Sequence, residues 1–141
     1  QSQSGKTGRL SNAMTIGKKI RVLVVDDSSF MRSAITRHIE RNARFQVVGS
    51  AANGREAVAK ARQLRPDVIT LDVEMPRMTG FDLTARIRAE RRLADLPVIL
   101  VTALASPRDR ERGIEVGASA YIVKSEFDQG NLLEIIRRLA G

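Results

Sequence analysis

Residues 68–80 read VITLDVEMPRMTG, in which a short apolar run ends in Asp72 and the following segment closes on Gly80. A nearly continuous run of β-branched and apolar residues is typical of a strand buried on both faces of a parallel sheet. A second run of this kind, IRVLVV at 20–25, ends in Asp26-Asp27. Parallel strands need crossover connections, which are usually helices. The two runs therefore predict an α/β fold.

Outward from these two strands, strand and helix patterns alternate along the chain. Further strands are predicted at 45–51, 98–101 and 120–123. Apolar spacing, capping residues, prolines and glycines predict five helices. These helices begin after Ser28 or Ser29, run from Gly54 up to Pro66, and cover 79–90, 107–116 and 131–140. Five alternating pairs indicate a single doubly wound sheet with helices on both faces.

Acidic, hydroxyl and ammonium side chains, which can bind ligands or react, follow the carboxyl ends of the predicted strands. In such sheets, ligands bind beyond those ends. Taken singly, each residue has an ordinary explanation as a helix cap, a β-branched strand residue or an exposed strand end. Three acids at one edge, however, would repel each other unless a cation offsets them. The combination predicts a functional site made of Asp26, Asp27, Asp72, Thr102 and Lys124.

These residues, with Met75-Pro76 and Gly80, resemble the receiver domains of two-component signalling over roughly residues 20–139. The resemblance implies a flavodoxin-like, five-stranded parallel sheet in the order 2-1-3-4-5 with five helices. It also implies that Asp72 accepts a phosphoryl group from a histidine kinase. Mg²⁺ would bind directly to Asp27, Asp72 and the backbone carbonyl of Glu74, while Asp26 holds a metal-bound water.

The same resemblance implies phosphoryl-contacting and switch residues. Lys124 and the Thr102 hydroxyl would contact the phosphoryl oxygens, the small Ala103 would leave access for the donor, and Tyr121 would be the switch aromatic. Three positions depart from the family pattern. Ser125 replaces a common proline, and Glu74 and Leu104 stand where side chains of relatives orient the hydrolytic water.

Composition narrows the remaining choices. The chain has 43% apolar and 28% charged residues, no cysteine and a formal charge of +8. Residues 1–13 resemble an expression-tag remnant, so the receiver domain is expected at 14–141. No apolar run reaches the roughly 20 residues of a membrane span. We expect a cytoplasmic protein that has no membrane association and, since its arginines are dispersed, no direct contact with nucleic acid.

The expected partners are a histidine kinase and a downstream protein. The latter would bind the face formed by the helix at 107–116, the strand at 120–123 and the helix at 131–140. A phosphorylation-dependent dimer is left open. We expect no enzymatic activity beyond self-phosphorylation and self-dephosphorylation, and an Asp-x-Asp phosphatase signature is absent because Glu74 follows Asp72 by two positions.

Two alternatives concern the parent protein. DDSSFMR at 26–32 and LDVEMPRM at 71–78 resemble the receiver half of chemotaxis methylesterases. The stretch from Pro97 to Leu139, which includes KSEFD at 124–128, is closer to the receivers of hybrid chemotaxis kinases. The chain is therefore either a free-standing regulator or a fragment of one of these proteins.

Overall fold

The computed structural model describes residues 18–127 and 131–141, and the expected tag remnant at 1–13 lies outside them. Within these ranges, five parallel strands form one sheet in the order β2-β1-β3-β4-β5, as predicted. The strands are β1 (Ile20–Val25), β2 (Phe45–Ala51), β3 (Val68–Leu71), β4 (Val98–Thr102) and β5 (Ala120–Val123). The helices between and after them are α2 (Ser29–Glu40), α3 (Gly54–Leu64), α4 (Gly80–Ala89), α5 (Pro107–Glu115) and α6 (Leu132–Ala140).

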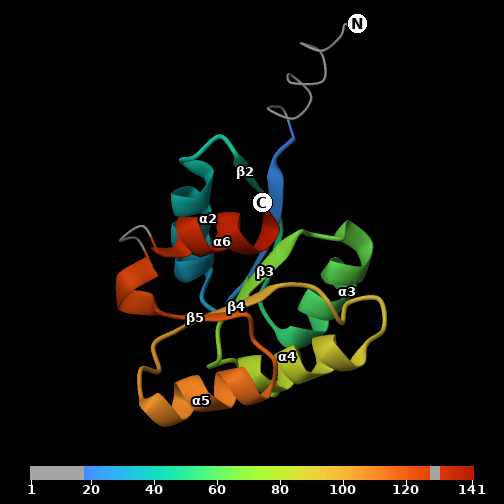
Figure 1. The fold of residues 1–141 in the computed structure, drawn as a ribbon, viewed down its shortest axis with the longest axis vertical. Coiled ribbons are helices and arrows are strands. Elements are labelled where there is room, and N and C mark those ends of the chain that lie inside the picture. The colour runs from blue at the N-terminus through green and yellow to red at the C-terminus, as the bar shows by residue number, and fades with distance from the viewer. Residues whose placement is uncertain (1–17, 128–130) are drawn as a thin grey trace, which may run out of the picture.

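The helices cover the two faces of the sheet (Figure 1). Alternate residues of β1 belong to different cores: Val22 and Val24 pack with α2 and α6, whereas Leu23 and Val25 pack with α3 and α4. Because side chains of a strand alternate between faces, a continuous apolar run serves both layers. This is the physical reason that the six-residue run at 20–25 predicts a central strand.

Side-chain caps set where several helices begin, at the carboxyl ends of the strands. The hydroxyl of Ser28 accepts a hydrogen bond from the Met31 N–H at 3.2 Å, and Asn53 caps α3 through the Glu56 N–H at 2.9 Å. Thr79 and Asp82 form a reciprocal capping box on α4. Such caps satisfy backbone donors that the first helical turn leaves unpaired.

Two details differ from the predicted elements. The strand expected at 98–101 extends to Thr102, which is completely buried. Phe30 has helical spacing with the apolar residues of α2, yet 72% of it is exposed. Ile35 and Ile39 define the inward face of α2, and five residues at 100° each place Phe30 about 140° around the axis from Ile35. Among the described residues, no helix is long and apolar enough to cross a membrane.

Candidate functional site

Three carboxylates meet at the carboxyl edge of β1 and β3. One ligand oxygen from each of Asp26, Asp27 and Asp72 lies within 4.8 Å of the others. Asp26 and Asp72 are buried, while Asp27 is exposed. The backbone holds the acids in place beyond the strands, since the N–H of Asp72 donates to the carbonyl of Val25 at 3.1 Å. The sheet thus continues to position residues that follow its regular strands.

Lys124 reaches this acidic cluster from the end of β5. Its Nζ lies 2.8 Å from Oδ2 of Asp26 and 3.2 Å from Oδ2 of Asp72. Burial lowers the pKa of Lys124, but its contacts with Asp26 and Asp72 outweigh this effect and raise that pKa. Burial, opposed by Lys124 and assisted by the charge of Asp26, raises the pKa of Asp72. The ammonium therefore stays charged within a partly dehydrated acidic site.

The donor set fits a hard divalent cation. Three carboxylates face one ammonium, so two formal negative charges of the cluster have no partner within it. Mg²⁺ prefers oxygen ligands and keeps several waters, for which the exposed side of the cluster at Asp27 leaves room. Burying like charges without compensation is costly. Asp26, Asp27 and Asp72 could therefore hold this cation.

The loop after Asp72 is packed tightly against the site. The N–H of Glu74 donates to Oδ1 of Asp72 at 3.2 Å, and the N–H of Gly80 donates to the carbonyl of Val73 at 2.9 Å. A Cβ atom at Gly80 would lie 2.3 Å from the carbonyl oxygen of Asp72 and 2.7 Å from Cα of Val73. The glycine in the sequence motif is explained by this close approach of α4 to the backbone of the proposed acceptor.

Thr102 and Tyr121 are connected through one residue, Leu104. The N–H of Leu104 donates to Oγ1 of Thr102 at 3.3 Å, and the hydroxyl of Tyr121 donates to the carbonyl of Leu104 at 2.9 Å. Thr102 is buried, Ala103 is exposed beside it, and the Tyr121 ring is half-buried. Burial raises the pKa of the Tyr121 hydroxyl, so this hydroxyl remains a donor at neutral pH. A movement of Thr102 would therefore be transmitted to Tyr121.

Sequence reasoning missed two residues that support this site. The guanidinium of Arg32 donates to the carbonyl of Asp26 at 2.7 Å. Gly113 lies against the Tyr121 ring, because a Cβ atom there would be 3.0 Å from that ring. For Arg32, an arginine on a polar helix face, the sequence gives no local signal of its contact. For Gly113, the sequence gives one indirect signal, because a glycine in a helix interior lowers stability and therefore calls for a reason.

The fold and this edge cluster define a doubly wound α/β signalling module of the kind expected from the sequence. The chain belongs to the response regulator receiver domain family, whose sequence profile matches residues 22–137. Its relatives include chemotaxis regulators.

Two curated relatives are longer proteins. The chain is 43% identical over 122 residues to a protein-glutamate methylesterase/protein-glutamine glutaminase of Alkalilimnicola ehrlichii, covering 85% of this chain and 30% of that protein. It is 40% identical over 122 residues to a gliding motility regulatory protein of Myxococcus xanthus, covering 86% of this chain and 15% of that protein. The chain thus spans less than a third of either relative.

Two solved structures match along nearly their whole length. The response regulator domain of CheB from Thermotoga maritima superposes with a TM-score of 0.79 and 38% identity, covering 87% of this chain and 97% of that one. Chemotaxis protein CheY4 of Vibrio cholerae superposes with a TM-score of 0.77 and 37% identity, covering 86% and 98%. Both support the chemotaxis-type resemblance.

Proposed function

We propose that Asp72 accepts a phosphoryl group from a histidine kinase and that the modified domain changes its binding to a partner. The observation that carries this proposal is the buried Asp72 carboxylate, which shares a 4.8 Å cluster with Asp26 and Asp27 and lies 3.2 Å from Lys124. Membership in the receiver family supports the same assignment.

In the proposed transfer, a carboxylate oxygen of Asp72 attacks the phosphorus of a phosphohistidine. The new O–P bond forms as the P–N bond breaks, and the departing imidazole nitrogen takes a proton from solvent. Mg²⁺, when held by Asp27, Asp72 and the Glu74 carbonyl with Asp26 behind a water, supplies positive charge for the phosphoryl oxygens.

Lys124 and Thr102 would complete the phosphoryl-binding set. Charged lysine offers donors and no acceptor, so Lys124 is suited to a phosphoryl oxygen. It already lies beside the oxygen of Asp72 at 3.2 Å. The Thr102 hydroxyl would donate to another oxygen, and the small, exposed Ala103 leaves the donor access. Such preorganised donors stabilise charge as it develops in the transition state.

The output step would use the chain of contacts from Thr102 through Leu104 to Tyr121. When the Thr102 hydroxyl turns to the phosphoryl group, its 3.3 Å contact with the Leu104 N–H changes, and with it the position of the Tyr121 ring. We place the downstream protein partner on the face of α5, β5 and α6, where Ile114 is 74% exposed. A phosphorylation-dependent dimer is left open.

The parent protein and its location are part of the proposal. The 43% identity to a methylesterase relative favours a regulatory receiver segment of such an enzyme as the second candidate, beside a free-standing regulator. In either case residues 14–141 would form the receiver domain and catalyse only their own phosphorylation and dephosphorylation. A cytoplasmic location, where ATP-dependent kinases act, also stays a prediction.

The test is phosphorylation by acetyl phosphate, followed by intact-mass measurement. We expect one phosphoryl adduct on the wild type with Mg²⁺, none with EDTA, and none on Asp72→Asn. The asparagine retains the size of the carboxylate and removes its charge, which makes it a matched control. An adduct of equal yield on Asp72→Asn would reject Asp72 as the acceptor.

A further inference from the structure

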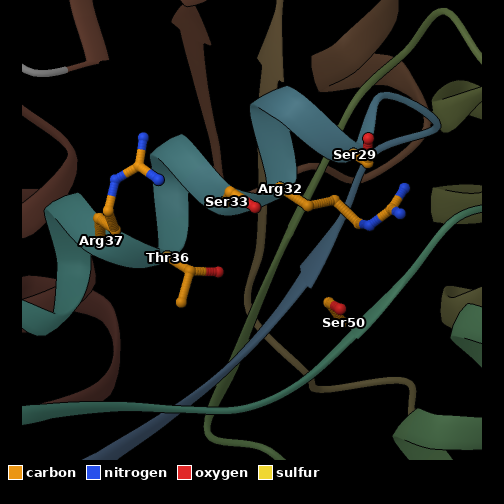
Figure 2. A pocket seen from close by; sticks show the side chains of 6 residues that line it. All are labelled: Ser29, Arg32, Ser33, Thr36, Arg37 and Ser50. Carbon is orange, nitrogen blue, oxygen red and sulfur yellow. The ribbon is translucent and has the colours of Figure 1, made fainter.

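A polar pocket of about 400 Å³ lies between α2 and the edge strand β2. Its lining comprises Ser29, Arg32, Ser33, Thr36 and Arg37 of α2 and Ser50 of β2 (Figure 2). The five helical residues recur at i, i+3, i+4, i+7 and i+8, which is the spacing of one helix face. The core-facing residues Ile35 and Ile39 lie elsewhere on α2. Core packing therefore does not account for this face.

The chemistry of the lining selects an anion. All six residues carry a hydroxyl or a guanidinium group, so none of the described residues that line the pocket contributes a carboxylate. Guanidinium groups have five N–H donors and no acceptor, and hydroxyls can also donate. A concave surface with this many donors suits a ligand that consists of acceptor oxygens and carries negative charge.

One cation of the lining is held by the backbone. Arg32 is half-buried, and its guanidinium donates to the carbonyl of Asp26 at 2.7 Å. A solvated polar helix face would leave its long side chains unconstrained. Here Arg32 is already ordered, so less conformational entropy is lost when a ligand binds.

We propose that this pocket binds the phosphate chain of a small molecule that carries two or three linked phosphate groups. Arg37 ends the row on one side, the Arg32 side chain extends toward Ser29 on the other, and Ser33 and Thr36 lie between the two arginines (Figure 2). Five residues separate their backbones by about 7.5 Å along the helix axis. A single phosphate would contact one guanidinium, whereas a phosphate chain reaches both and takes hydrogen bonds from the hydroxyls between them.

Ligand binding in this pocket would affect the acidic cluster. Arg32 holds the carbonyl of Asp26, which directly precedes Asp27. A ligand that contacts the guanidinium of Arg32 changes the strength of this hydrogen bond, and with it the backbone that positions both acids. Coupling between two sites is reciprocal, so ligand affinity would also respond to a cation in the cluster. The binding step itself does not depend on the proposed phosphorylation of Asp72.

The test is a titration with inorganic tripolyphosphate, with orthophosphate as the comparison, at constant ionic strength and without Mg²⁺. Calorimetry gives the affinity, and amide chemical shifts give the location. We expect saturable one-to-one binding that shifts the amides of residues 29–37 and Ser50. Tripolyphosphate should bind at least about tenfold more tightly than orthophosphate, because one additional charge-assisted contact contributes about 1.5 kcal/mol or more.

Two arginine variants separate the pocket from general charge attraction. Arg37→Ala should weaken tripolyphosphate binding about tenfold or more. Arg41→Ala removes an equal charge from an exposed residue one turn further along, outside the lining, and should weaken it less than about twofold. Equal losses in the two variants, shifts confined to the Asp72–Lys124 edge, or no saturable binding would each overturn the proposal. Phosphorylation by acetyl phosphate is measured separately, so failure of either proposal leaves the other testable.

Discussion

Substituting Gly80 by alanine should damage both the stability of the domain and its phosphorylation. The added Cβ would lie 2.3 Å from the carbonyl oxygen of Asp72, whereas ordinary contact begins at 3.4 Å. Backbone atoms must therefore move by about 1 Å. Overpacking of this kind costs about 3 kcal/mol, at the upper end of its usual range. Gly80 is the first residue of α4, so the better helix propensity of alanine returns at most about 1 kcal/mol, the value for a helix interior. We expect a net loss of at least about 2 kcal/mol in the free energy of unfolding.

Urea denaturation measures that loss, which corresponds to a fall of roughly 8 °C in Tm for a domain of this size. The same 1 Å displacement moves the residue proposed as the nucleophile, and misplacements of that size reduce rates by up to about 100-fold. The initial rate of phosphorylation by acetyl phosphate should therefore fall at least about tenfold.

Gly49→Ala is the matched control. A Cβ at Gly49 meets the tip of the Leu64 side chain at 2.8 Å, and a flexible side chain can turn away where backbone cannot. We expect this variant to lose less than about 1 kcal/mol and to phosphorylate normally. A Gly80→Ala domain with wild-type stability and a wild-type rate of phosphorylation would refute the argument, since it would show that the loop after Asp72 can accommodate a Cβ atom at this position.

Three further predictions concern the proposed chemistry. Lys124→Ala should bind Mg²⁺ at least as tightly as wild type in a calorimetric titration, because the substitution removes a positive charge from the acidic cluster. The same variant should lose the response of α5, β5 and α6 to beryllofluoride, because the phosphoryl oxygens lose their ammonium donor. Weaker metal binding with an intact response would contradict this role. Tyr121→Phe removes the 2.9 Å hydrogen bond to the Leu104 carbonyl, so urea denaturation should show a loss of about 1 kcal/mol in the free energy of unfolding. The variant should also reduce the amide shifts that beryllofluoride induces in α5, β5 and α6. Unchanged shifts would exclude the proposed switch. Glu74→Asn and Leu104→Glu should each shorten the lifetime of the phosphoryl group measured after donor removal. The first removes a negative charge beside the phosphoryl group, and the second supplies a side chain that can orient the hydrolytic water. Slower decay in both variants would mean that the two effects have the opposite sign.

The sequence by itself determined the succession of elements and the residues at the strand ends. These features are local: the runs at 20–25 and 68–71 are apolar because both faces of each strand are covered, and Ser28, Asn53 and Thr79 cap the helices that follow them. The order of the strands was predicted through the family resemblance. With parallel strands in that order, the expected site residues had to gather at one edge.

Only the tertiary structure decided which of those residues touch and what supports them. Lys124 pairs with an acid 52 positions earlier in the chain, a contact that depends on how β5 ends relative to β3. The Leu104 backbone joins Thr102 to Tyr121, and the guanidinium of Arg32 turns to the carbonyl of Asp26. Composition and spacing say nothing about such links, because side-chain directions and backbone carbonyls acquire neighbours only when the helices pack on the sheet. The pocket between α2 and β2 arises in the same way, since Ser50 joins the α2 row only in the folded domain.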